Sequence, residues 1–168
     1  MLLSSLQLIA LGGIEMKPLA NKSIEGSCTQ CHFVYQAGFL PKRSWERLFS
    51  DESLSDHFGE KVEMTDAVRE EFLKYYLQYS ADKRKNRTSK NIDRSISKSI
   101  TPIEVATLEF IKEKHENLKK EMYDSPKIRT VANCTACHGE DAKKGIYSEM
   151  DVEIPGWKKK FFIWWVKK

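Results

Sequence analysis

Two five-residue stretches, Cys28-Thr29-Gln30-Cys31-His32 and Cys134-Thr135-Ala136-Cys137-His138, share the pattern Cys-x-x-Cys-His. They contain all four cysteines of the chain. In a helical turn the two cysteines of such a motif lie on the same side, so both sulfurs can form thioethers with one edge of a porphyrin. The next residue then directs its imidazole at the iron. The pattern predicts two covalently attached haem c groups, with His32 and His138 as proximal iron ligands.

The Cys-x-x-Cys spacing alone also occurs in zinc sites and in redox disulfides. The main alternative is therefore one four-cysteine zinc site built from both pairs, with the histidines incidental. A thioredoxin-like site has less support, because no βαβ pattern surrounds either pair. Two complete motifs within 168 residues favour haem.

The number of histidines predicts the remaining axial ligand of each iron. The chain has four histidines, and only His57 and His115 lie outside the two motifs. Two irons each need one further axial ligand, so we expect bis-histidine ligation with His57 and His115 as distal ligands. Such irons lack the methionine ligand that raises the potential of other cytochromes, so low potentials follow. They also have no open position for a substrate, which predicts an electron carrier and not an enzyme.

The two distal assignments rest on different local patterns. His115 lies on an apolar helical stripe within residues 101–122, where the alternative is a core histidine bonded to a backbone carbonyl. His57 lies in a turn-like stretch with acidic neighbours. The methionines that could replace either histidine are Met64, Met122 and Met150. If one iron were open, the protein would instead be a dihaem peroxidase, a small reductase or a gas sensor. We expect each distal histidine to serve the haem of its own lobe.

Several stretches around these residues resemble the dihaem cytochromes c, small periplasmic electron carriers first described in photosynthetic bacteria. They are residues 28–32, 38–45, 56–59, 113–116 and 133–138, with Ile154-Pro155. The resemblance implies a mostly helical fold with two haem lobes, and His57 and His115 as distal ligands. It also implies redox protein partners, namely a monohaem c-type cytochrome as acceptor and a membrane b-type cytochrome as donor. The basic linker and the Lys-rich aromatic tail depart from the family pattern.

The pattern along the chain predicts a mostly α fold with long irregular connections and little or no sheet. Residues 1–20 read as a secretion signal or its remnant, 21–80 as an N-terminal haem lobe, 81–100 as a basic linker and 101–168 as a C-terminal haem lobe with an aromatic and Lys-rich tail. Helices are expected over 41–49, over 65–79 and after Asn133. A further helix is expected to begin at the capping box of residues 101–104. The apolar face of the 65–79 helix is expected to carry Val68, Phe72, Tyr75 and Tyr79. We expect this face to cover a haem, and the alternative is an ordinary hydrophobic core.

Composition and charge restrict the location and the partners. A net charge of +4 from 28 basic and 24 acidic side chains gives no argument for a nucleic-acid partner. The apolar run 2–14 is too short to span a bilayer but suits a secretion signal, which predicts a periplasmic protein. Its alternative is a helix of the mature domain.

The basic linker could steer an acidic redox partner or be a solvated loop. The tail 157–168 could contact an anionic membrane surface, dock on a membrane oxidoreductase or fold back on the domain.

Overall fold

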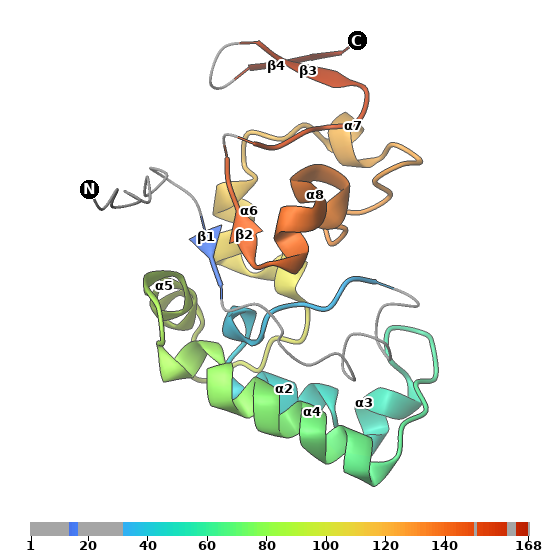
Figure 1. The fold of residues 1–168 in the computed structure, drawn as a ribbon, viewed down its shortest axis with the longest axis vertical. Coiled ribbons are helices and arrows are strands. Elements are labelled where there is room, and N and C mark those ends of the chain that lie inside the picture. The colour runs from blue at the N-terminus through green and yellow to red at the C-terminus, as the bar shows by residue number, and fades with distance from the viewer. Residues whose placement is uncertain (1–13, 17–31, 150, 161–163, 168) are drawn as a thin grey trace, which may run out of the picture.

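The structure is a computed structural model that describes residues 14–16, 32–149, 151–160 and 164–167. Its α-helices are α2 (Lys42–Leu48), α3 (Asp51–Ser55), α4 (Asp66–Tyr79), α5 (Arg87–Ser95), α6 (Glu109–Lys114), α7 (Lys120–Tyr123) and α8 (Thr135–Lys143). Three short 3-10 helices are η1 (Ala37–Phe39), η2 (Ala81–Lys83) and η3 (Val105–Thr107). The strands β1 (Ile14–Glu15) and β2 (Ile146–Tyr147) pair, as do β3 (Trp157–Lys160) and β4 (Trp164–Lys167). The mostly α fold is confirmed (Figure 1).

Helix α4 forms where the sequence predicts it, and the face that it turns inward includes Tyr76 as well as the expected residues. Its N-cap Thr65 accepts a hydrogen bond from the Val68 backbone, which satisfies a free donor of the first turn. Its buried residues are Phe72 and Tyr76, one helical turn apart. Tyr75 and Tyr79 are only partly buried. Val68, Tyr75 and Tyr79 nevertheless pack against the larger core, so the expected stripe is confirmed, and Tyr76 is a buried residue that it did not include.

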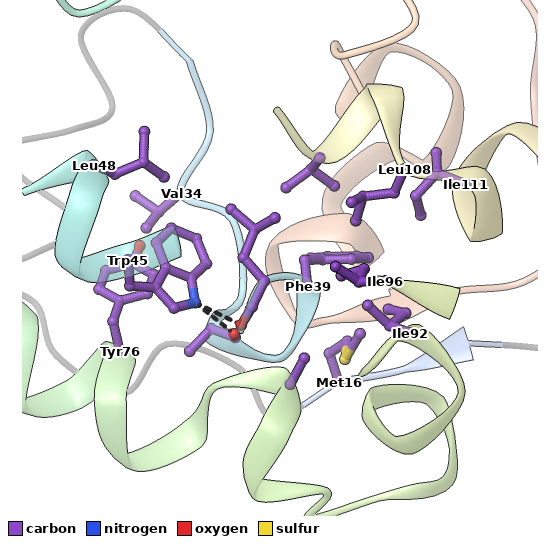
Figure 2. Packing of buried hydrophobic residues seen from close by; sticks show 14 of the residues in the cluster. Met16, Val34, Phe39, Trp45, Leu48, Tyr76, Ile92, Ile96, Leu108 and Ile111 are labelled. Carbon is purple, nitrogen blue, oxygen red and sulfur yellow. Dashed lines mark hydrogen bonds between the residues drawn. The ribbon is translucent and has the colours of Figure 1, made fainter. Parts of the chain in front are cut away.

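The buried face of α4 packs against α2 and not against a cofactor cavity. The ring of Tyr76 lies 4.2 Å from that of Trp45, and the ring of Phe72 lies 5.6 Å from that of Phe49. Trp45 donates its indole N–H to the carbonyls of Ala37 and Leu40, at 2.9 and 3.0 Å (Figure 2). These bonds fix η1 against α2. Helix α4 lines neither of the two cavities described below, and that its apolar face covers a haem stays a prediction.

One core joins parts of the chain that are far apart in sequence. Figure 2 shows Met16, Phe39, Ile92 and Leu108 gathered in it. Tyr147 from β2 belongs to the same cluster. A smaller cluster of Met122, Ile128 and Ile154 lies apart from it. The N-terminal and C-terminal halves therefore share the larger core.

The basic segment 81–100 is folded. Asn86 caps α5 by accepting from the Ser89 backbone at 2.8 Å, and Ile92 and Ile96 of this segment are buried one turn apart. Its basic side chains point outward and are exposed. The sequence pattern missed the helix because two apolar residues stand alone among Arg, Lys, Ser and Asn.

The helix expected to begin at the capping box of residues 101–104 does not begin there. The chain is extended at Glu104 and again at Leu108, with η3 between them, and α6 begins only at Glu109. Leu108 and Ile111 are both buried in the larger core. Packing of these two side chains outweighs the local capping signal.

The N-terminal strand is part of the folded domain. Met16 is buried, and its backbone N–H donates to the Gly145 carbonyl at 2.7 Å. A side chain at Gly145 would place its Cβ 2.4 Å from the Met16 carbonyl oxygen, and the φ of +79° already disfavours other residues. Residues 1–13 and 17–20 of the expected signal lie outside the described residues. None of the described helices has the length and apolarity needed to cross a membrane.

We expect Gly145→Ala to lower the free energy of unfolding by about 3 kcal/mol, because it combines an unfavourable φ with a backbone clash. Gly156→Ala is the matched control. Its φ is +86°, but no atom lies within 4 Å of the added Cβ, so only about 1 kcal/mol should be lost. Urea unfolding of the exported protein measures both. Equal losses would show that the approach of Met16 does not restrict position 145.

The buried carboxylate of Asp93 makes the stability of the fold depend on pH. Its side chain is 2% exposed and accepts from Arg84 at 2.8 Å and from Lys98 at 3.0 Å. Burial alone raises the pKa of this carboxyl, but the two hydrogen bonds and the two cations outweigh it and hold the pKa below its usual value. The ionised form is therefore the one that stabilises the fold, and its contribution is lost as the pH falls through the folded pKa.

We expect Asp93→Asn to cost about 1 to 3 kcal/mol near neutral pH. The difference from the unsubstituted protein should shrink as the pH falls below the usual carboxyl pKa of about 3.9. Asp66→Asn, which changes an exposed partner of Arg69, should cost less at every pH. Urea unfolding across the acid range measures the difference, and a cost independent of pH would contradict the assigned role of the charge.

Candidate functional site

The first histidine pair joins His32 to His57. The ring centres lie 6.3 Å apart, and the rings are inclined by 23°. Nδ1 of His32 lies 2.6 Å from the Phe33 carbonyl. His57 begins a tight turn closed by a hydrogen bond from its N–H to the Glu60 carbonyl at 2.7 Å. Cys28 and Cys31, the predicted attachment residues of this site, lie outside the described residues.

The turn that carries His57 is backbone-strained. Phe58 and Gly59 have φ values of 56° and 92°, the combination of a two-residue hairpin turn. A positive φ is unusual for a residue as large as phenylalanine. Phe58 is exposed, and its ring stands edge-on to that of His57 at 4.9 Å. His57, the residue before this turn, stacks on His32.

The second motif is a single helical turn at the start of α8. The His138 N–H donates to the Cys134 carbonyl at 2.8 Å, and the Cys137 N–H donates to the same carbonyl at 3.3 Å. Both cysteines are half-buried free thiols. They and His138 line one cavity, which is the arrangement that the motif predicts.

His115 ends α6 and faces the second motif. Its ring centre lies 6.2 Å from that of His138, with the two rings nearly perpendicular at 87°. Nδ1 of His115 lies 2.7 Å from the Ile111 carbonyl, one turn back along α6. This is the backbone contact of the core-histidine alternative, but it occupies only one ring nitrogen and leaves Nε2 available to bind a metal.

The cavity between the second histidine pair is large and mostly apolar. It encloses about 1360 Å³ of empty space, its open mouth included. Aromatic and aliphatic side chains form most of the wall, among them Tyr35, Phe39, Ile111, Leu118, Tyr147 and Ile154. Two cysteines and two histidines are the groups in this wall that can bond a haem and its iron. The residues present fit a large planar cofactor attached through Cys134 and Cys137.

The electrostatics keep the ligating groups neutral. Burial, with a smaller effect of the neighbouring His115, lowers the pKa of His138 to about 4. Burial and the neighbouring His32 lower the pKa of His57 in the same way. Burial raises the pKa of Cys134 to about 12. Neutral imidazole is the form that binds a metal, so both histidines are ready to do so at neutral pH.

A smaller cavity opens beside His57. Its empty volume is about 540 Å³, and its wall includes Asp56, Phe58 and Glu104. Nδ1 of His57 is buried and has no hydrogen-bond partner among the described residues. Neither Met64 nor Met122 lines either cavity, and Met150 lies outside the described residues. The geometry therefore favours His57 and His115 over the methionines as distal ligands.

The zinc alternative finds no support in the part of the chain that the structure describes, where no three His, Cys, Asp or Glu side chains gather around one point. Because two of the four cysteines lie outside that part, a four-cysteine site is not tested.

Three residues that sequence reasoning did not single out connect the two sites. The Tyr35 hydroxyl donates to the Ala132 carbonyl at 2.6 Å, two residues before Cys134. Gln36 donates to the Ala142 carbonyl of α8 at 2.8 Å and accepts from the Tyr147 hydroxyl. Tyr147 in turn lies against His138, with ring centres 5.3 Å apart. Gln36 is a single polar residue four positions after the first attachment motif and belongs to no periodic pattern, so the sequence did not reveal this contact.

Comparison with known proteins agrees with this geometry. Among curated protein sequences no relative matches the chain. Among solved structures, a dihaem cytochrome c from Rhodobacter sphaeroides is 30% identical with a TM-score of 0.68, over 78% of this chain and 99% of that one. A dihaem c-type cytochrome from Shewanella baltica is 26% identical with a TM-score of 0.63, over 81% of this chain and 94% of that one. The family model described as dihaem cytochrome c matches residues 24–147. The chain therefore belongs to the dihaem cytochrome c family, whose cofactors are two haem c groups with iron.

Proposed function

We propose that this protein is a periplasmic electron carrier in which each iron is held between two histidines, His32 with His57 and His115 with His138. The observation that supports this most directly is the distance between the two ring centres within each pair, 6.3 Å for His32 with His57 and 6.2 Å for His115 with His138. A metal–imidazole bond is about 2 Å long and a ring centre lies about 1 Å beyond its nitrogen, so two imidazoles on one metal have centres about 6 Å apart. Both pairs have this spacing.

The chain fixes the ring orientation at both sites. The Nδ1 contacts of His32 and His115 with backbone carbonyls set the tautomer and leave Nε2 of each ring for the iron. When bound, haem iron supplies one-electron exchange between its ferric and ferrous states. Because one ring of each pair is held by a backbone carbonyl, these two ligands need little rearrangement when the charge of a site changes. Histidine on both sides favours low potentials and leaves no open position, which separates this proposal from a peroxidase, a reductase or a gas sensor.

The distribution of charge supports redox proteins as partners. The exposed acidic residues of the segment 51–71 are Asp51, Glu52, Asp56, Glu60, Glu63, Asp66, Glu70 and Glu71. Only Lys61 and Arg69 oppose them there. This acidic segment, which contains His57 in sequence, lies at one end of α4, whereas the basic helix α5 lies at the other end (Figure 1). The field at the His57 site therefore favours a partner with a positively charged face.

The family resemblance suggests which redox proteins these are. A monohaem c-type cytochrome is the candidate acceptor, and a membrane b-type cytochrome is the candidate donor. The lysines and aromatic residues of the tail 157–168, where β3 and β4 form an antiparallel hairpin, make this segment the candidate for peripheral membrane contact.

The ligation is tested with His57→Ala and His115→Ala in a host that matures c-type cytochromes. We expect the unsubstituted protein to carry two covalent haems by mass, to be low-spin and not to bind carbon monoxide. Each variant should keep both haems and bind one equivalent of carbon monoxide, because one iron has lost its sixth ligand. Carbon monoxide binding by the unsubstituted protein would favour the enzyme or sensor. A colourless product beside a mature control cytochrome would favour zinc.

The charge distribution is tested with small redox probes of opposite charge. We expect a cationic oxidant such as hexaammineruthenium(III) to react several-fold more slowly after Asp56→Lys with Glu104→Lys at low ionic strength. The effect should fade near 0.15 M salt, where the screening length is about 8 Å. Lys90→Glu with Arg94→Glu, at the far end of α4, is the control and should not slow this probe. Stopped-flow oxidation of the reduced protein gives the rates, and equal effects of the two pairs would contradict the proposed polarity.

A further inference from the structure

An unbroken series of aromatic contacts leads from one histidine pair to the other. The ring of Tyr35 lies 5.7 Å from that of His32, and the ring of Phe39 stands edge-on to Tyr35 at 6.4 Å. Tyr147 stands edge-on to Phe39 at 5.4 Å. The series ends at His138, whose ring centre is 5.3 Å from that of Tyr147. All of these separations lie within the range of contacting aromatic pairs, about 4.5 to 7 Å.

The middle of the series is buried, and hydrogen bonds hold its two tyrosines. Phe39 and Tyr147 are 2% and 6% exposed, Tyr35 is partly buried, and Gln36, which accepts from the Tyr147 hydroxyl, is fully buried. The Tyr147 hydroxyl is bound by the Gln36 amide, and the Tyr35 hydroxyl by the Ala132 carbonyl. Burial also raises the pKa of both tyrosines, so both hydroxyls stay protonated and keep donating. The rings are therefore fixed relative to each other as well as to the histidines.

We propose that Tyr35, Phe39 and Tyr147 are positioning residues that form the intramolecular route for electron exchange between the two haem sites, with Gln36 holding the rings in contact. This inference rests on the proposed electron-carrier function. In each exchange one electron leaves the ferrous iron of one site, which is oxidised, and enters the ferric iron of the other, which is reduced. No proton moves, no bond breaks, and every iron ligand stays in place.

Packing explains why this series can serve as the route. Electron exchange over a distance is faster through groups in contact than across empty space, and each ring of the series contacts the next. The contacts join residues 32–39 to residues 138–147, which approach each other only through the fold. Phe39 is the central ring, so replacing it by an aliphatic side chain interrupts the series while keeping the core apolar.

The experiment compares Phe39→Leu with Phe72→Leu. Both phenylalanines are buried in the same core, at 2% and 0% exposure, and both pack edge-on against another ring. Phe72 lies off the series, in α4. The readout is NMR of the half-reduced protein, in which fast exchange between the sites averages the haem methyl resonances. Covalent mass, visible spectra and the two reduction potentials are recorded for each variant.

We expect Phe39→Leu to slow the exchange by about tenfold or more and Phe72→Leu to leave it within about twofold of the unsubstituted rate, at similar losses of stability. Unchanged exchange in Phe39→Leu, or equal slowing in both variants, would overturn the proposal. Tyr147→Leu and Tyr147→Phe form a second pair if Phe39→Leu does not fold. Leucine should slow the exchange and phenylalanine, which keeps the ring, should slow it much less. An open iron in the unsubstituted protein would instead contradict the proposed function.

Discussion

The buried amide of Gln36 joins the two halves of this molecule. It follows the first attachment motif by four positions, yet it donates to a carbonyl of α8 and accepts from the hydroxyl of Tyr147. A buried amide without partners is costly, so these bonds are kept wherever the fold is kept. Because α8 begins at the second attachment motif, the same amide ties the position of one haem site to that of the other. The shared core around Phe39 and Leu108 forms on both sides of this contact.

The chemistry of the site could be predicted from the sequence because it depends on residue identity at fixed spacing. With two Cys-x-x-Cys-His motifs and two further histidines, few combinations of side chains could supply the axial ligands of two irons. The structure brings His57 to His32 and His115 to His138, as the expected pairing within each lobe requires. The ligation itself remains a prediction, and Cys28 and Cys31 lie outside the described residues.

Packing between distant segments could not be predicted in the same way. The capping box of residues 101–104 satisfies every local rule for a helix start, yet the burial of Leu108 and Ile111 sets the helix elsewhere. Two isoleucines among basic and polar residues are enough to dock α5, although their neighbours suggest a linker. On α4, Tyr76 is buried beside the expected Phe72 because it packs on Trp45, a contact that the helical pattern does not indicate. In each case a contact with a remote part of the chain decided the outcome.

The burial of Met16 has a consequence for maturation. The strand Ile14–Glu15 pairs with β2, and the next residue fills a space bounded by Gly38, Ser89 and Gly145. A peptidase that removed an export leader by cutting after residue 16 would take this side chain out of the core and expose the glycines that accommodate it. A cut that left Ile14 and the residues after it in place would keep the pairing of β1 with β2 and the burial of Met16. Any trimming of this end of the chain is therefore constrained by the space that Met16 fills.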